Sequence, residues 1–248
     1  MIEIKGLTKS FKGQVVLDRL DLKIAAGEVV AIIGKSGGGK SVLLKHLIGL
    51  LKPDAGTILI NGVDITSVDI HGLRNVRQKF GVVFQGSALF DSLTVFGNVA
   101  FPLRERTKLP AEAIRENVLE ALEDVGLRGM GNKYPAEISG GMKKRVALAR
   151  ALIAEPSIVL FDEPTTGLDP LILNSIHRLI THTHRKYRFT GIIISHEIPE
   201  IFDVADRVAM LYNGAIIQYG TPEEIQKTDN PFVKQFITGS SEGPIETL

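Results

Sequence analysis

Cysteine and tryptophan are absent from this chain of 248 residues. Without cysteine there are no disulfide bonds and no thiolate-ligated metal site, so a reducing compartment is compatible with the sequence but not demanded by it. An excess of charge is also lacking, because 29 lysines and arginines balance 28 acids and leave a net charge of +1. This balance gives no global field that would attract nucleic acid, and we expect no nucleic-acid partner.

Long hydrophobic runs are absent too. No stretch of about 18 consecutive apolar residues occurs, which predicts that nothing spans a membrane. The opening MIEIKGLTKSF lacks the basic and then apolar plan of a signal peptide. Hydrophobic residues make up 44% and charged residues 23%, values typical of a globular protein with a full core. The length suits one large domain, or a domain with an inserted subdomain.

What the chain does contain is a series of short, β-branched apolar runs. Residues 28–34, 157–164 and 190–197 have the composition of buried parallel strands. Asn-Gly pairs at 61–62 and 213–214 lie between apolar runs and predict hairpins. Strands that alternate with helical patterns indicate an α/β fold with a mostly parallel sheet.

A mostly helical segment, from about residue 86 to residue 154, interrupts this pattern. Ile114, Val118, Leu122 and Val125 fall on one face of a helix. The segment therefore has the character of a helical insertion in an α/β core.

The segment GKSGGGKS at 34–41 fits the phosphate-binding pattern G-x-x-x-x-G-K-[ST]. Its glycines let backbone N–H groups surround the phosphates, Lys40 reaches the β- and γ-phosphates, and the Ser41 hydroxyl ligates Mg²⁺. The alternative is a chance glycine-rich turn. The position of the motif, between an expected strand and an expected helix, argues against that alternative.

Polar residues at the ends of the apolar runs are candidates for chemistry. Asp162 would hold Mg²⁺ through water, and Glu163 would polarise the water that attacks the γ-phosphate. The alternative is a turn with two solvated acids, which Pro164 would suit. Gln85 is either a ligand of Mg²⁺ or of the attacking water, or a polar strand end. His196 either donates to the γ-phosphate or is a buried, satisfied histidine.

The stretch ISGGMKKRVALAR at 138–150 offers a second anion cradle. A hydroxyl and two glycines stand at the start of a basic helix, where free N–H groups and the helix dipole favour negative charge. The presence of two phosphate cradles in one chain of this size requires an explanation.

Taken in order, these motifs resemble those of the ATPase subunits of ATP-binding cassette (ABC) transporters, over essentially the whole chain. The resemblance implies a P-loop NTPase core with a mostly parallel sheet, an N-terminal antiparallel β part and an inserted helical subdomain. Within a single domain of residues 1–248, it places the nucleotide-binding core at 1–85 and 155–220. The helical subdomain is expected at 86–154 and contains the signature loop, which ISGGM at 138–142 matches. A C-terminal extension is expected at 221–248.

The resemblance also assigns roles to individual residues. Three are expected to be catalytic: Glu163, His196 and Gln85. Those expected to bind the nucleotide are Phe11, stacked on adenine, with Gly34, Lys35, Ser36, Gly37, Gly38, Gly39, Lys40, Ser41 and Val42. The expected Mg²⁺ ligands are Ser41, Gln85 and Asp162. The D-loop residue is Asp169, and the residues expected to contact the ATP of a partner subunit are Ser139, Gly140, Gly141 and Met142.

A head-to-tail homodimer, which this family forms, explains the two cradles. Each ATP is held by the 34–41 loop of one subunit and the signature loop of the other, with ATP and Mg²⁺ as cofactors. Met142 stands where glutamine is usual, and this removes one side-chain hydrogen bond. The following cations Lys143, Lys144 and Arg145 either add positive potential near the partner's ATP or form a solvated face.

Three stretches narrow the resemblance to the ATPases that work with mammalian-cell-entry (MCE) lipid-binding proteins: GKSVLLKHLIGLLKPD, FQGSALFDSLTVFGNVAFPLRE and SGGMKKRVALARAL. This resemblance implies phospholipid transport between envelope membranes, driven from the cytoplasmic face of the inner membrane. The implied partners are a membrane permease, docked on residues 86–127, an MCE lipid-binding protein and a small STAS-domain regulator. An ABC ATPase for another solute, or a soluble ABC ATPase of translation or repair, stays open.

The tail carries one further signal. Asn230 can cap a short helix that has Pro231 at its first position and ends at Gly239. Phe232 and Phe236 would share one face of this helix with Ile237. The tail is either an interaction element or is docked on the chain's own core.

Overall fold

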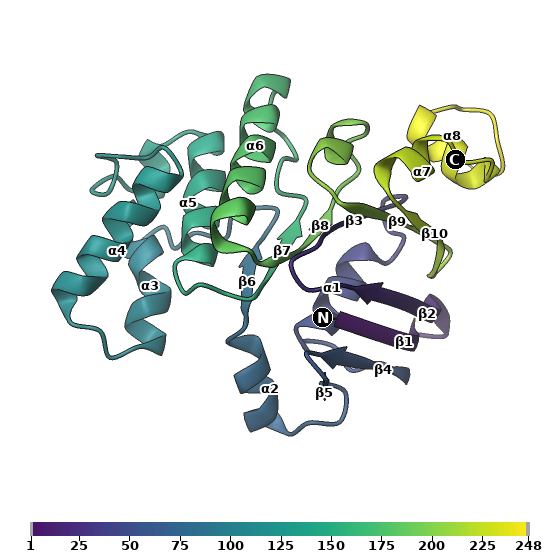
Figure 1. The fold of residues 1–248 in the computed structure, drawn as a ribbon, viewed down its shortest axis with the longest axis horizontal. Helices are drawn as coiled ribbons and strands as arrows, with labels where there is room; N and C mark the ends of the chain where they lie inside the picture. Colours follow the sequence, from purple (N-terminus) through teal and green to yellow (C-terminus); the bar gives the residue numbers. More distant parts are fainter. Residues whose placement is uncertain (1, 247–248) are drawn as a thin grey trace. The chain divides into compact units, whose positions relative to one another are not determined.

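The computed structural model describes residues 2–246, which divide into two compact units (Figure 1). Unit 1 combines the described residues up to 78 with those from 190 onward, and unit 2 comprises residues 79–189. Chain segments far apart in sequence therefore build unit 1, whereas unit 2 is continuous.

The first part of unit 1 is an antiparallel sheet with the strand order β2-β1-β4-β5. Its strands are β1 (Ile2–Phe11), β2 (Gln14–Ile24), β4 (Ala55–Ile60) and β5 (Val63–Asp64). Lys12 and Gly13 both have positive φ and join β1 to β2 in the two-residue turn that such angles favour. The hairpin at residues 61–62 and the N-terminal antiparallel part are both confirmed.

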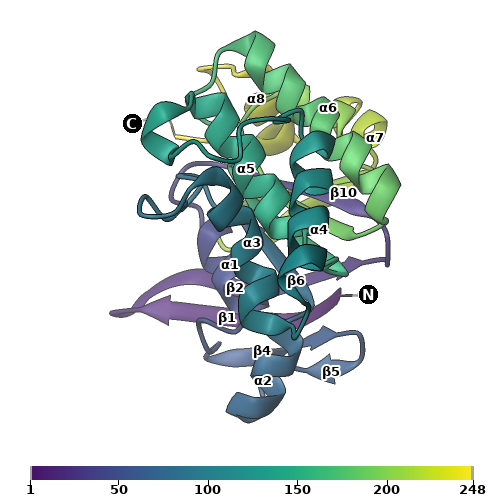
Figure 2. The ribbon, with the colours of Figure 1, turned by 90° about the vertical axis from the view of Figure 1, so that its left-hand side faces the viewer.

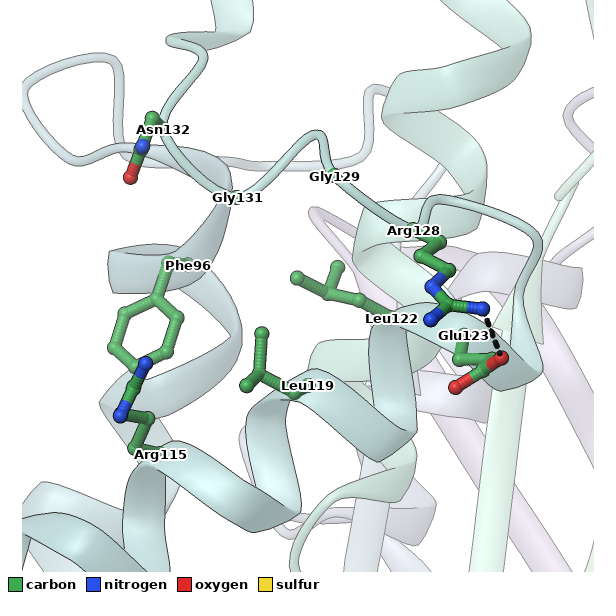
Figure 3. Close-up of a pocket in the computed structure, with 9 residues that line it drawn as sticks. All are labelled: Phe96, Arg115, Leu119, Leu122, Glu123, Arg128, Gly129, Gly131 and Asn132. Carbon is green, nitrogen blue, oxygen red and sulfur yellow. Dashed lines mark hydrogen bonds and ion pairs between the residues drawn. The ribbon is translucent and has the colours of Figure 1, made fainter.

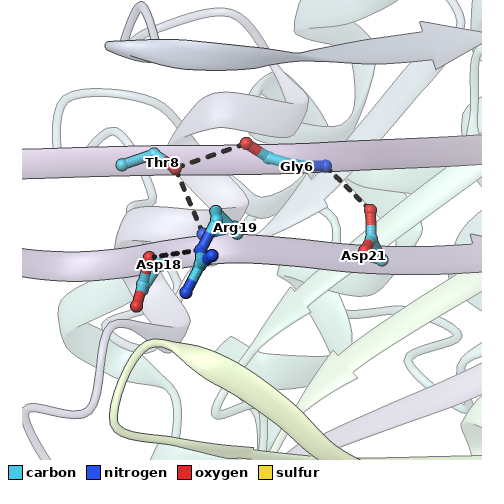
Figure 4. A network of polar contacts seen from close by, with 5 residues as sticks. All are labelled: Gly6, Thr8, Asp18, Arg19 and Asp21. Atoms are coloured by element: carbon cyan, nitrogen blue, oxygen red, sulfur yellow. Dashed lines mark hydrogen bonds and ion pairs between the residues drawn. The ribbon is translucent and has the colours of Figure 1, made fainter.

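Irregular pairing between β1 and β2 is compensated by side chains (Figure 4). The register shifts between Ile4 and Leu7, next to Gly6, whose φ is 57°. There the Gly6 N–H donates to Asp21 Oδ1 at 2.8 Å, and the Arg19 N–H donates to Thr8 Oγ1 at 3.1 Å. The bulge takes these backbone N–H groups out of the hydrogen bonding between the strands, and side-chain oxygens accept from them instead.

The second sheet of unit 1 has the strand order β10-β9-β3-β8. Its strands are β3 (Val29–Ile33), β8 (Thr190–Ile194), β9 (Arg207–Tyr212) and β10 (Ala215–Gly220). Strand β3 runs parallel to both β8 and β9, and every residue of β3 and β8 is buried, as the apolar runs predict. The hairpin predicted at 213–214 is confirmed. The helices of unit 1 are α1 (Lys40–Leu47), α2 (Ile70–Arg77), α7 (Pro222–Gln226) and α8 (Pro231–Thr238), with a 3₁₀ turn at Glu200–Asp203.

Unit 2 pairs two parallel strands with four helices. The strands are β6 (Phe80–Val83) and β7 (Ile158–Asp162). The helices are α3 (Val95–Arg106), α4 (Ala111–Asp124), α5 (Gly140–Leu152) and α6 (Pro170–Tyr187), with a 3₁₀ turn at Pro135–Glu137. Helices α3, α4 and α5 lie side by side (Figure 2). The stripe predicted on α4 and the residue after it is buried at all four positions, which confirms that helix.

The tail helix α8 forms as predicted. Asn230 Oδ1 accepts hydrogen bonds from the N–H groups of residues 232 and 233, and Gly239 ends the helix with φ of 66°. The two buried positions of the helix, however, are Val233 and Gln235 rather than the phenylalanines. The side-chain amide of Gln235 exchanges two hydrogen bonds with the backbone of Ile245, so the last residues fold back on the helix. The tail is docked on its own unit.

A polar cluster joins α4 to α6 in unit 2. Lys186 Nζ lies 3.0 Å from Glu120 and 2.6 Å from Asp124, and the Tyr187 hydroxyl donates to Asp124 at 2.8 Å. Burial and this hydrogen bond raise the pKa of Tyr187 to about 12. The cluster fixes the end of α6 against α4.

We expect Tyr187→Phe to lower the free energy of unfolding by about 0.5–1.5 kcal/mol, because it removes one donor from a partly buried carboxylate. Denaturant unfolding measures the change. Tyr134→Phe removes a hydroxyl from a side chain of unit 2 that is 47% exposed, and it is expected to cost less than about 0.5 kcal/mol. Equal losses in the two variants would contradict the role given to the cluster.

Candidate nucleotide-binding and hydrolysis site

The loop between β3 and α1 in unit 1 is shaped by close backbone packing. A Cβ on Gly34, whose φ is 147°, would lie 2.2 Å from the Leu211 carbonyl oxygen, so only glycine fits there. Gly39 takes a left-handed conformation, with φ of 94°, at the start of α1. The buried Lys40 turns its ammonium group back over the loop and donates to Gly34 O at 2.7 Å and Lys35 O at 3.0 Å. A cation therefore sits at the centre of a turn that precedes a helix N-terminus, where anions are favoured.

A cavity of about 470 Å³ in unit 1 opens beside this loop. Its lining includes Val15 and Val16 of β2, Ser36 and Gly37 of the loop, and Tyr212 of β9. A cavity of this volume is of the size that small-molecule ligands occupy.

The remaining nucleotide-binding candidates of unit 1 lie at the ends of its strands and helices. Phe11, at the end of β1, is 41% exposed, and Lys9 Nζ lies 5.5 Å from the centre of its ring. Ser41 and Val42 stand in the first turn of α1. His196 follows β8 and is exposed, so it is not the buried histidine of the alternative interpretation.

The last described residue, Glu246, contacts the 34–41 loop. Lys35, inside the loop, donates from Nζ to the backbone oxygen of Glu246 at 2.7 Å. The ring of Phe232 in α8 lies 5.0 Å from the ring of Tyr212, which lines the cavity. Neither contact has a signal in the sequence, because no local pattern pairs residue 35 with residue 246 or residue 212 with residue 232.

Unit 2 contains the carboxylate expected to act on water. Gln85 Nε2 donates to Glu163 Oε2 at 2.8 Å, and Thr166 Oγ1 donates to the same oxygen at 3.2 Å. Glu163 follows the end of β7 at Asp162 and has a φ of 48°, a left-handed conformation that costs about 1–2 kcal/mol for a residue with a Cβ. Strain of this kind is commonly retained at functional sites. Thr166 was missed at the sequence level, although a hydroxyl residue three positions after an acid is a recognisable turn signal.

The signature loop begins α5 as the sequence predicts. Ser139 is the N-cap, and its Oγ accepts from the Met142 N–H at 3.2 Å. A Cβ on Gly141 would lie 2.7 Å from Cγ2 of Ile172 in α6, so this glycine is also required for helix packing. Asp169 caps α6 by accepting from two backbone N–H groups at 3.1 Å each.

Of the three cations that follow the signature loop, Lys144 fits neither interpretation made from the sequence. It is buried, and its Nζ donates to the Gln85 carbonyl oxygen. Arg150, further along α5, donates to the carbonyl oxygens of Ser87 and Ala88 at 2.8 Å and 2.7 Å. Neither contact could be predicted, because a lysine or arginine on a helix is usually solvated.

A second cavity, of about 610 Å³, lies in unit 2 between α3, α4 and the 128–132 loop (Figure 3). Phe96 and Leu119 form part of its wall, and Arg115 and Arg128 flank it. Each arginine is paired with a glutamate, Arg128 with Glu123 at 3.4 Å and Arg115 with residue 112 at 3.3 Å. Because the charge of each arginine is balanced by a glutamate, the cavity does not have the excess positive charge that is typical of an anion site.

The predicted site residues are thus shared between the units. Unit 1 carries residue 11, residues 34–42 and His196, and unit 2 carries Gln85, residues 139–142, 162–163 and Asp169. Within unit 2, Gln85 and Glu163 are in direct contact. The combination of Ser41 with Asp162 in one site stays a prediction.

Oxygen atoms dominate the candidate metal ligands. Ser41 offers a hydroxyl, Asp162 a carboxylate and Gln85 an amide oxygen, and this hard donor set suits Mg²⁺. Residues 2–246 contain no group of three or more histidine or acidic side chains that could hold a metal ion.

Comparison with known proteins identifies the family. The family described as ABC transporter matches residues 17–166. The probable ribonucleotide transport ATP-binding protein mkl of Mycobacterium leprae is 46% identical over 98% of this chain and 70% of its own length. The intermembrane phospholipid transport system ATP-binding protein MlaF is 42% identical in Haemophilus influenzae, over 99% of this chain and 93% of its own. The MlaF of Escherichia coli K12 is 37% identical over 99% of this chain and 91% of its own length.

Two solved structures share the fold. CbiO1 of Clostridium perfringens, part of the ABC transporter complex CbiONQ, has a TM-score of 0.84 and 34% identity over 90% of this chain and 89% of its own. The ATP-binding cassette MJ0796, a dimer in a post-hydrolysis state bound to ADP and Pi, has a TM-score of 0.81 and 33% identity. The match covers 90% of this chain and 99% of that one.

The chain belongs to the ABC transporter family of ATP-binding cassettes. It is an ATPase coupled to transport, and cassettes of this family act as dimers together with membrane permease components. In the part of the chain that the structure describes, no helix is both long enough and apolar enough to span a membrane.

We expect Lys40→Ala to weaken ATP binding about tenfold or more, because a charge-assisted contact to the phosphates is lost. Titration calorimetry measures the affinity. Lys35→Ala is the matched control in the same loop, since its side chain is exposed and its backbone N–H is kept. We expect it to change the affinity less than about threefold. Wild-type affinity in Lys40→Ala would contradict the assignment of the loop.

Proposed function

We propose that this chain is the ATP-hydrolysing subunit of a transporter that moves phospholipid between envelope membranes. It would act on the cytoplasmic face of the inner membrane as a homodimer. The observation that supports hydrolysis most directly is the Glu163 carboxylate, which is held by Gln85 and Thr166 at the end of β7. The support for phospholipid comes from two relatives named as ATP-binding proteins of an intermembrane phospholipid transport system, which match 99% of the chain.

In the proposed reaction Glu163 takes the proton of the water that attacks the γ-phosphate. The donors from Gln85 and Thr166 engage the same carboxylate oxygen, and together they fix the orientation of the group that accepts the proton. Lys40 holds the β- and γ-phosphates, Phe11 stacks on adenine, and His196 donates to the γ-phosphate. Mg²⁺, held by Ser41, Gln85 and Asp162, would neutralise charge that develops on the phosphate oxygens.

A second subunit completes each site in this proposal. The first N–H groups of α5 have no partner within the helix, and two glycines leave them accessible to a phosphate. Ser139 adds a hydroxyl, and Gly140 and Gly141 add backbone donors. Residues 139–142 would therefore bind the γ-phosphate that the 34–41 loop of the partner holds, so that ATP closes the dimer and hydrolysis opens it.

The docking place for the permease is proposed to be an apolar groove in unit 2. The groove measures about 310 Å³ and its lining includes Phe84, Phe90, Phe101, Pro102 and Arg150. The three phenylalanines are exposed, and the rings of Phe90 and Phe101 lie 4.8 Å apart. Large exposed apolar side chains that gather in one place are typical of a protein-binding surface. The groove adjoins Gln85 in sequence and so connects the permease to the catalytic carboxylate.

Ribonucleotide transport is the second candidate, because the mycobacterial relatives at 45–46% identity are named as probable ribonucleotide transport proteins. The two candidates differ in the cargo and in the accessory subunits. A lipid transporter would require an MCE lipid-binding protein, with a STAS-domain protein as regulator, whereas a ribonucleotide transporter would require a site for a soluble anion.

We expect the native complex, purified through this chain, to contain phospholipid together with a permease and an MCE protein. Mass spectrometry identifies both the lipids and the subunits. An unrelated ABC importer, purified in the same detergent, controls for lipid carried along from the membrane. Enrichment of ribonucleotides without phospholipid above that control would contradict the lipid proposal and favour the second candidate.

We expect Glu163→Gln to keep ATP binding and to lower hydrolysis by a factor of about 10² or more, because the general base is lost. The ATP-closed dimer should then persist, since ATP is no longer consumed. The measurements are the rate of phosphate release and the population of dimer in the assembled transporter.

Ser139→Arg, added to Glu163→Gln, tests the head-to-tail site. A bulky cation would fill the space meant for the partner's γ-phosphate, so the trapped dimer should disappear while ATP binding to the 34–41 loop remains. If the double variant still forms the trapped dimer, residues 139–142 do not complete a partner's site.

A further inference from the structure

Helix α5 holds the loop that follows β6 by two of its basic side chains. Lys144 Nζ donates to the carbonyl oxygen of Gln85. Arg150, six residues later, donates to the carbonyl oxygens of Ser87 and Ala88. Three carbonyl groups within four residues of the loop therefore face one helix and accept from it.

The loop requires such support because its backbone is unusual. Ser87 and Ala88 are consecutive, neither is glycine, and both have positive φ, at 62° and 46°. A left-handed conformation at a residue with a Cβ is strained, and it persists only where surrounding contacts hold the backbone in place. The guanidinium of Arg150 has several N–H donors, so it can hold both carbonyl groups at once, one from Nη1 and one from Nη2. It also lies 5.9 Å from the centre of the Phe90 ring.

The far end of the loop is anchored independently. Asn98 of α3 is fully buried, accepts from the Phe90 N–H at 2.8 Å and donates back to the Phe90 oxygen at 3.0 Å. Arg150 thus holds residues 87 and 88 and Asn98 holds residue 90, while Lys144 is the side chain that holds the Gln85 carbonyl group.

The side chain and the backbone of Gln85 have separate partners. Its carbonyl oxygen accepts from Lys144, and its side-chain nitrogen donates to Glu163 at 2.8 Å. A continuous chain of contacts thus runs from Lys144 of α5 through Gln85 to the Glu163 carboxylate. Lys144 is four residues from Gly140, about 6 Å along the helix from the signature loop.

We propose that Lys144 is a positioning residue for ATP hydrolysis, one that transmits the position of α5 to Glu163 through Gln85. This inference rests on the proposed function, in which the start of α5 binds the ATP held by the partner. Because α5 is rigid, a shift of its first turn toward that ATP carries Lys144 with it and moves the Gln85 backbone. Contact between the start of α5 and the partner's ATP then sets the hydrogen bond between Gln85 and Glu163. Glu163 acts on the other ATP, the one that its own chain holds.

Lys144→Met tests the inference, because methionine keeps the apolar stem and removes the donor and the charge. In the assembled transporter we expect kcat for ATP hydrolysis to fall about tenfold or more, while KM and the affinity for ATP stay within about twofold. Lys144→Arg, which restores a donor, should return kcat to within about threefold of wild type. A lysine that served only to stabilise the fold would lower the melting temperature without this split between kcat and KM.

Lys143→Met is the matched control, since it removes the same charge one residue earlier and about 100° around the helix. We expect it to change kcat less than about twofold. An equal fall in the two variants would assign the effect to positive potential and overturn the inference, as would wild-type kcat in Lys144→Met. If Lys144→Met does not fold, Lys144→Leu, which also removes the donor and the charge, replaces it under the same criteria.

Hydrogen exchange supplies a second readout. Lys144→Met should speed amide exchange at residues 85–88 and leave α5 unchanged, and unchanged exchange at 85–88 would also overturn the inference. Glu163→Gln separates this inference from the proposed function. If Glu163→Gln stops hydrolysis but Lys144→Met does not slow it, only the inference fails. If Glu163→Gln hydrolyses ATP normally, the proposed role of Glu163 fails.

Discussion

The close approach of β3 to β9 at Gly34 is the constraint on which the nucleotide loop depends. The Leu211 carbonyl oxygen occupies the position that a Cβ of residue 34 would take, so residue 34 has to be glycine. Its φ of 147° is a conformation that glycine adopts readily. The same strand pairing buries all of β3 and directs its carboxyl end toward α1. The geometry of the 34–41 loop is therefore a consequence of how tightly a parallel sheet packs, and Lys40 adds a cation to a turn whose shape the sheet already determines.

Unit 2 contains a second local constraint, the pair of side-chain hydrogen bonds that Glu163 accepts. Glu163 accepts from an amide and a hydroxyl, neither of which carries a charge. Lys144 and Arg150, two cations of the same unit, donate to backbone carbonyl groups of the loop that carries Gln85.

Sequence patterns predicted the parts of the fold that depend on local composition. The strands at 28–34 and 190–197 were recognisable because both faces of each are buried, and the hairpins because Asn-Gly pairs adopt positive φ readily. The pairing of β1 with β2 could not be predicted from the pattern of apolar residues, since its register shifts break the alternation. Lys144 was misread because its partner is 59 residues away in sequence, and no local signal separates a buried lysine from a solvated one. For the same reason α8 was expected to present its phenylalanines to a partner or to the core, whereas its buried polar residue Gln235 is satisfied by contacts with the returning tail.

The contact between Lys35 and the backbone of Glu246 places the end of the described chain against the phosphate loop. Anything attached at residue 246 begins within a few ångströms of the loop, so a bulky tag there is a perturbation, whereas a small fluorophore there is a reporter. Because the chain has no cysteine, a single thiol introduced at position 246 would be its only thiol. A fluorophore attached to that thiol would lie next to the 34–41 loop.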